Sequence, residues 1–153
     1  MLSNLLYPFL GGLSEAFINS YLSKNLDEYK AKMNLMTILS LSLLQKSGEL
    51  NTPLKTLDII LKIYNFHPSE EMKEPLVAES KTVKFGFDCL AEKNDFFLNI
   101  LSYEDRLIFL EAIITCLQEA NTLNANEKNV VKLAVQFQCK KKDFIMMIKK
   151  QLV

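Results

Sequence analysis

The chain has 153 residues, 49% of them hydrophobic, with 18 basic and 18 acidic side chains and a formal net charge of +0. This length and apolar content suit one domain around a single core and leave too little chain for a second domain. The balanced charge excludes a global attraction to nucleic acid or to an anionic membrane, so a charge-driven partner would need a local patch.

The N-terminal segment carries an apolar run from Leu2 to Leu13, before the first charged side chain at Glu15. Pro8 interrupts this run and no basic residue precedes it, so it does not match a signal peptide. Apolar residues over 14–22 have helical spacing, and we expect an amphipathic helix within residues 1–25. The later apolar runs are shorter than the ~20 residues that span a bilayer. We therefore predict a soluble, cytoplasmic protein without a transmembrane segment.

A first helical hairpin is predicted over residues 33–67. Residues 26–45 have a helical pattern whose second half is apolar on nearly every side, which is typical of a central helix. Gly48 suits the left-handed residue after a helix end, and Thr52 and Pro53 suit the cap and first turn of the next helix. The side chains of that helix expected to share one apolar face are Leu54, Leu57, Ile60, Leu61 and Tyr64.

Residues 69–100 are predicted to connect the two halves of the chain. Residues 69–79 are acidic and contain Pro75, which is typical of an exposed connection. Val83, Phe85 and Phe87 alternate as in a strand, but a lone strand would have no sheet to join. We therefore predict that residues 76–92 are mostly helical and that residues 94–100 form a short helical segment.

A second hairpin and a C-terminal helix are predicted over residues 102–152. Ser102 and Asp105 have the spacing of a capping box. The helix after them should present a narrow polar stripe of Glu111, Thr115 and Gln118, and should bury Leu107, Leu110, Ile113, Ile114 and Leu117.

The two helices that end the chain follow from the same periodicity. Asn126 is a suitable cap for the first of them, and lysines are frequent on the second. The apolar residues of the first are Val130, Val131, Leu133, Ala134 and Phe137. Those of the second are Phe144, Ile145, Met147, Ile148 and Leu152.

One spacing recurs in both hairpins. Leu44-Gln45 followed by Leu50-Asn51 recurs, at a constant offset, as Leu117-Gln118 followed by Leu123-Asn124. The recurrence predicts an all-α, single compact helical domain of about seven helices built from two pseudo-repeated helical hairpins.

These hairpins resemble those of a known family. Residues 117–127, then Val130, Val131, Leu133, Ala134 and Lys142-Asp143-Phe144, resemble the second half of TerB-like domains, the tellurite-resistance family. The turn Ser47-Gly48-Glu49-Leu50 is similar to that of their first half, so the resemblance covers roughly residues 33–152. It implies divalent-metal binding through acidic residues and a place in stress-response or membrane-associated complexes.

The acidic residues of that family are largely replaced in this chain. Ser47 and Ala120 stand where the family has aspartates and Leu54 where it has a glutamate, while Glu127 matches. Hard cations need several converging oxygen ligands, so we expect no bound metal and no other cofactor. If a metal were bound, its candidate ligands would be Glu49, Glu119, Asn121 and Glu127.

No catalytic residue is predicted. Cys89, Cys116 and Cys139 are odd in number and widely spaced, which suits reduced thiols, and Cys116 lies in an apolar run that should raise its pKa. The single histidine, His67, precedes Pro68 and suits a loop. The chain contains no phosphate-binding loop, nucleophile elbow or H-E-x-x-H sequence.

Lysines concentrate near the end of the chain, and we predict that Lys140, Lys141, Lys142, Lys149 and Lys150 form a protein-binding edge. Three successive lysines at a helix start oppose the helix dipole, which suggests a use such as contact with an acidic partner or a second copy of the chain. Specific nucleic-acid readout is not expected, because base recognition commonly uses arginine and base stacking uses aromatic side chains. The chain has a single arginine, and Phe144 is the single aromatic residue among these lysines.

The leading hypothesis is a non-enzymatic helical protein-interaction module. Two alternatives stay open: a divalent-metal-binding TerB-like stress protein that uses rearranged acidic residues, and a small helical enzyme or ligand-binding protein whose site is not visible in the sequence.

Overall fold

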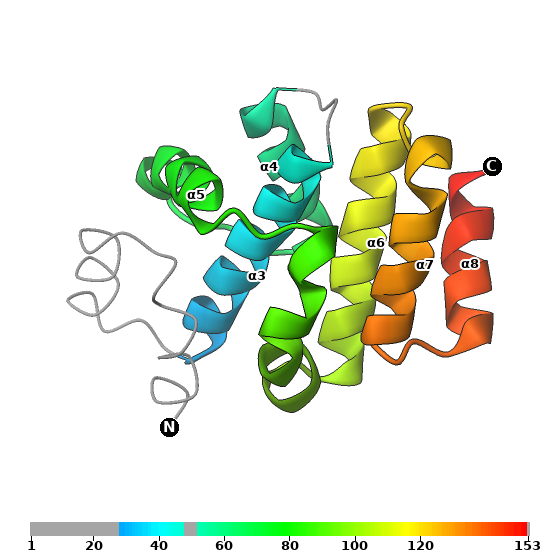
Figure 1. Ribbon diagram of the computed structural model, residues 1–153. Coiled ribbons are helices and arrows are strands. Elements are labelled where there is room, and N and C mark those ends of the chain that lie inside the picture. The colour runs from blue at the N-terminus through cyan, green and yellow to red at the C-terminus, as the bar shows by residue number, and fades with distance from the viewer. Residues whose placement is uncertain (1–27, 48–51, 153) are drawn as a thin grey trace.

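The computed structural model describes residues 28–47 and 52–152, and every regular element in these ranges is a helix (Figure 1). The α-helices are α3 (Glu28–Lys46), α4 (Pro53–Tyr64), α5 (Glu70–Val83), α6 (Tyr103–Glu119), α7 (Glu127–Gln136) and α8 (Lys141–Gln151). Three shorter helices are η1 (Phe87–Lys93), η2 (Phe96–Ile100) and η3 (Asn124–Asn126). The all-α prediction is confirmed. No helix in this part of the chain has both the length and the apolar character that a bilayer span needs. The helix expected within residues 1–25 and the turn at Gly48 lie outside the described residues.

Helix α3 lies at the centre of the core, as its apolar pattern predicts, and packs against α4, α5 and α6. Four of its polar side chains, Asn34, Thr37, Ser40 and Ser42, are buried as well. The hydroxyls of Thr37 and Ser40 donate to the carbonyl oxygens of Met33 and Met36 at 2.7 Å. The Ser40 hydroxyl is also hydrogen-bonded to that of Tyr64 on α4. These bonds satisfy hydroxyls that would be costly to bury unpaired.

Helix α4 begins as predicted, with Thr52 at the N-cap position and Pro53 in the first turn, although the Thr52 side chain makes no capping hydrogen bond. Asn65 ends the helix in the left-handed conformation at φ 50°. Four of the five side chains expected on the inner face are buried. The exception is Leu54, which is 47% exposed because it lies in the first turn beside an open groove.

Residues 69–79, expected to form an exposed connection, are the N-cap and first part of helix α5. Most of their side chains are exposed or half-buried, but the helix packs against α3 and buries Leu76 and Glu79. Pro75 lies inside this helix, where it removes one backbone donor. Burial of the apolar face therefore outweighs the local penalty of the proline, as is common for helices in folded proteins.

The prediction that residues 76–92 are mostly helical is confirmed, since α5 and η1 cover all of them except 84–86, which connect the two helices without helical structure. Lys84 ends α5 at φ 53°. The Ser42 hydroxyl of α3 accepts a hydrogen bond from the Phe85 backbone N at 2.7 Å and donates to the Phe85 carbonyl at 3.2 Å. A cluster of phenylalanine rings lies against this connection and includes Phe85, Phe96, Phe97, Phe109 and Phe137.

Helix α6 is the second central helix and begins with the predicted capping box. The Ser102 hydroxyl accepts from the Asp105 backbone N at 3.1 Å, and Asp105 Oδ2 accepts from the Ser102 N at 3.4 Å. Asp105 also pairs with Lys32 of α3 at 2.8 Å. Ile113 is fully buried, whereas Leu107, expected in the core, is only partly buried because it lies early in the helix, near its exposed start.

The last two helices form as predicted but pack less deeply. Three of their apolar residues, Val131 of α7, Ile145 of α8 and Leu152 at the C-cap of α8, are exposed, because no described helix covers those faces. Asn126 occupies the N-cap position of α7 without capping it, since its side-chain oxygen accepts from the Asn129 side-chain amide at 3.2 Å instead of from a backbone N–H. Its own amide nitrogen donates to the Thr122 carbonyl at 2.9 Å. Both predicted hairpins form, as α3–α4 and α6–α7, while their internal repeat stays a prediction.

Candidate functional site

The predicted lysine edge is built on α8, the last helix of the chain (red in Figure 1). Helix α8 packs against α6. Tyr103, in the first turn of α6, donates a hydrogen bond to Asp143 Oδ2 at 2.7 Å. The same hydroxyl accepts a hydrogen bond from the Lys140 backbone N at 2.8 Å. At the other end of α8, Lys150 pairs with Glu111 at 2.9 Å. These contacts lock both ends of α8 onto α6.

The apolar contacts of α8 are partial. Phe144, Met147 and Ile148 are half-buried against the core, and none of the residues of α8 is fully buried. The Gln151 side-chain amide donates to the Thr115 hydroxyl at 3.0 Å. The polar stripe predicted on α6 therefore supplies contacts for α8 through Glu111 and Thr115.

The five lysines predicted as a contact edge do not play the same part. Lys140 is the N-cap residue of α8, and its ammonium lies 5.4 Å from the centre of the Tyr103 ring. Lys141 and Lys142 begin the helix and are exposed, as is Lys149 near its end. Lys150 forms the ion pair with Glu111, so it helps hold α8 in place.

Exposed apolar side chains gather on the same two helices. Five of the seven large apolar side chains that are exposed in the described ranges lie on α7, on α8 or at the C-cap of α8. Val135 is 72% exposed and Met146 is 67% exposed. Val131, Ile145 and Leu152 belong to the apolar sets predicted for the two helices, whereas Val135 and Met146 do not.

These apolar residues alternate with lysines in one exposed stripe along each helix, and we call the two stripes the α7–α8 surface. On α7 the stripe is Lys128, Val131, Lys132 and Val135, and on α8 it is Lys142, Ile145, Met146, Lys149 and Leu152. Residues at i, i+3, i+4 and i+7 share one face of an α-helix. The spacing of these residues can be read in the sequence and places them on one face of each helix. It does not show whether that face is buried or exposed.

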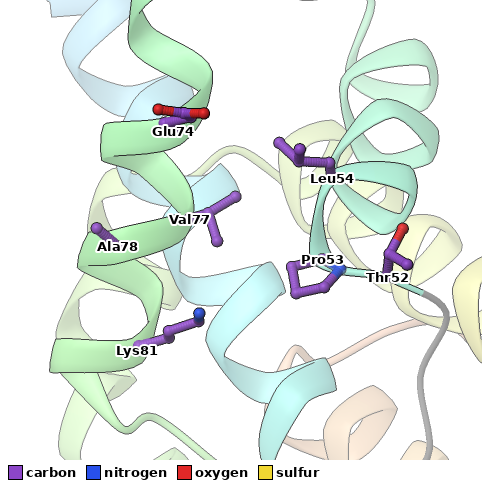
Figure 2. Close-up of a pocket in the computed structure, with 7 residues that line it drawn as sticks. All are labelled: Thr52, Pro53, Leu54, Glu74, Val77, Ala78 and Lys81. Carbon is purple, nitrogen blue, oxygen red and sulfur yellow. The ribbon is translucent and has the colours of Figure 1, made fainter.

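A groove of about 510 Å³ lies between the start of α4 and the middle of α5 (Figure 2). Val77 points across it towards Pro53 and Leu54. Its charged lining residues, Glu74 and Lys81, are two helical turns apart, so they offer no acid and base pair. The groove lacks the converging polar groups that orient a small ligand in a typical binding pocket.

The candidate metal ligands lie in or near the two predicted turns. Glu119, Asn121 and Glu127 are exposed around the turn between α6 and α7, and Asn121 is left-handed at φ 58°. Glu49 lies outside the described residues. Within residues 28–47 and 52–152, no three His, Cys, Asp or Glu side chains come close enough together to hold a metal ion.

Two of the thiols and one buried hydroxyl are poor nucleophiles. All three cysteines are free. Burial raises the pKa of Cys116 to about 12, as its apolar run predicts, and burial also raises the pKa of Cys139. Burial likewise raises the pKa of Tyr64. At neutral pH Cys116, Cys139 and Tyr64 therefore keep their protons.

Comparison of the chain with protein-family models, with curated proteins and with solved structures finds no match in any of the three. The resemblance to TerB-like domains therefore stays an expectation that rests on the turn and helix residues of 33–152.

Proposed function

We propose that this chain is a non-enzymatic interaction module that binds a protein partner through the α7–α8 surface. The observation that carries the proposal is the coincidence of exposed apolar side chains and lysines on the same faces of two helices. Single exposed apolar residues are common on protein surfaces and need no explanation. A group of them on one surface is typical of an interaction site.

The chemistry of the surface supports binding to protein. Val135 and Met146 are largely exposed, and covering them would remove apolar area from water at roughly 25 cal/mol per Å². The lysines around them would set the association rate and its salt dependence. The predicted place of TerB-like domains in stress-response or membrane-associated complexes would fit such a module, and that assignment is part of the proposal.

The proposal is tested by affinity capture from cells that express the protein, with wild type compared to a Val135→Ser, Met146→Ser double variant. Both side chains are exposed, so the variant should keep its melting temperature and lose the captured proteins. A Leu54→Ser variant is the matched control, because Leu54 is 47% exposed on α4, away from the surface. Equal capture by all three proteins would refute the proposal.

Charge is tested separately with a Lys141→Glu, Lys142→Glu, Lys149→Glu variant. Capture at low salt should weaken, and the difference from wild type should shrink as salt rises. The control is Lys55→Glu, Lys62→Glu, which reverses two exposed lysines on α4. If both reversals weaken capture equally, the effect belongs to net charge and the α7–α8 surface loses its special role.

A further inference from the structure

We infer that the partner segment is an acidic amphipathic helix of another protein, which lies along the α7–α8 surface. This inference rests on the proposed function and adds the chemical class of the partner. It follows from the sign of the surface charge, from the spacing of the apolar residues and from the way α8 is held.

The α7–α8 surface is basic, because its two stripes contain four lysines and no acidic residue. The segment that carries it, residues 127–152, contains seven lysines and two acidic residues, Glu127 and Asp143, a formal excess of five positive charges in a chain whose net charge is zero. Asp143 accepts the hydrogen bond of Tyr103, and Lys150 is paired with Glu111. The stripe lysines occur in none of the ion pairs found among the described residues. A partner that neutralises them must be acidic.

The apolar side chains set the shape of the partner. Val131 and Val135 are one turn apart on α7, and Ile145 and Leu152 are two turns apart on α8. A partner helix with apolar residues at i, i+3, i+4 and i+7 offers anchors at the same intervals. Acidic residues beside those anchors would then meet the lysines that lie between the apolar positions of each stripe.

A lipid surface fits these stripes less well. Helices that lie in a membrane interface have a continuous apolar face with lysines on the opposite side or at its borders. In α8 the aromatic Phe144 and its neighbour Met147 pack towards the core, and Lys142 and Lys149 lie within the exposed stripe itself. In each stripe, apolar residues alternate with lysines. A partner helix can place an acidic side chain beside each lysine, whereas a plane of lipid headgroups cannot follow this alternation.

The test uses a fluorescein-labelled synthetic peptide of roughly 18 residues, or five helical turns. It carries leucines at helical spacing flanked by glutamates, and fluorescence anisotropy measures its binding to the full chain. A peptide of the same composition with the leucine spacing scrambled is the comparison. We expect the patterned peptide to bind about tenfold more tightly than the scrambled one. Its affinity should fall with salt and drop about tenfold in the Val135→Ser, Met146→Ser variant.

Each contrary result identifies another occupant. Equal binding of both peptides would reduce the interaction to net charge and overturn the inference. Co-sedimentation of the protein with vesicles of phosphatidylcholine and phosphatidylserine, without peptide binding, would favour a membrane. Sedimentation equilibrium that shows self-association lost in the Val135→Ser, Met146→Ser variant would favour a second copy of the chain.

The two proposals fail in different ways. If capture from cells depends on Val135 and Met146 but the patterned peptide does not bind, the interaction surface stands and the acidic helix is wrong. If neither depends on these residues, both proposals are wrong. The Leu54→Ser variant should bind the peptide like wild type, and its failure to do so would place binding in the groove beside α5.

Discussion

Tyr103, in the first turn of α6, fixes the first turn of α8 through Asp143. Its hydroxyl donates to the Asp143 carboxylate at 2.7 Å and accepts from the Lys140 backbone N at 2.8 Å. Because α8 has no fully buried residue, such polar contacts add to the partial packing of Phe144, Met147 and Ile148 in setting where it lies. The position of the proposed interaction surface therefore depends on a side chain that belongs to a different helix.

Replacing Tyr103 with Phe should loosen α8 selectively. The substitution removes both hydrogen bonds and should lower the free energy of unfolding by about 1 kcal/mol, since the groups left without partners are partly open to water. Urea unfolding would measure the loss, and hydrogen exchange should rise in α8 more than in α6. Equal exchange in α8 of the wild-type and variant proteins would contradict the role assigned to this contact.

Alkaline pH should destabilise the fold. Burial raises the pKa of Tyr103 to about 12, the hydrogen bond to Asp143 adds to the increase, and the Lys140 N–H opposes it. Burial also raises the pKa of Tyr64. The folded protein thus holds these protons more tightly than the unfolded chain, whose tyrosines titrate near 10.0. Stability should be full below that pH and fall above it. Urea unfolding followed upward from about pH 9 would detect the decline, which should be smaller in Tyr103→Phe.

Ser42→Ala should cost about 1–3 kcal/mol of folding free energy, because it leaves the buried backbone N–H of Phe85 without its acceptor. Thr37→Val is the matched control. The Thr37 hydroxyl bonds to the carbonyl of Met33, which already lies within a helix, so its removal should cost less. Chemical unfolding of both variants gives the comparison, and equal losses would show that the bond to Phe85 has no special weight.

Ile113→Asp should unfold the domain. Ile113 is fully buried in α6, and an unpaired buried charge costs several kcal/mol against a total stability of about 5–15 kcal/mol. Ile113→Val should cost only about 0.5–1.5 kcal/mol and keep the helical circular dichroism spectrum. A folded Ile113→Asp protein would mean that this part of α6 can reach water.

Millimolar calcium or zinc should leave the melting temperature unchanged. Glu119, Asn121 and Glu127 are exposed around the α6–α7 turn, and Ser47 and Ala120 lack carboxylates. A site with a dissociation constant of about 10 µM would add about 2.7 kcal/mol at a hundredfold excess of metal. Thermal unfolding with each metal and with a chelator tests this. A shift abolished by Glu127→Gln would revive the metal-binding alternative.

The sequence was sufficient to predict the helices because apolar residues recur at helical spacing in every long segment. It also predicted the buried centres of α3 and α6 and the capping box at Ser102. The sequence did not predict which apolar residues are exposed, because exposure depends on the neighbouring helices. Helical spacing marks Val131 and Leu152 as apolar positions, but it does not show whether another helix covers them. Pro75 was misleading for the same reason, because packing on α3 keeps α5 helical. The concentration of lysines near the end of the chain could be recognised in the sequence. The exposure of Val135 and Met146 could not.

The buried hydroxyls of α3 fix the rotation of this helix about its own axis, although its central part is apolar on nearly every side. An apolar helix could turn about its axis and still bury similar area, so hydrophobic burial alone discriminates weakly among its orientations. A rotation of α3 by one residue would separate Ser40 from Tyr64 and Ser42 from Phe85, and would leave the Tyr64 hydroxyl and the Phe85 backbone N–H without these partners in an apolar interior. The hydrogen bonds therefore favour one rotation of α3 among several that would bury similar apolar area. Helices α4, α5 and α6 pack against α3 in that rotation.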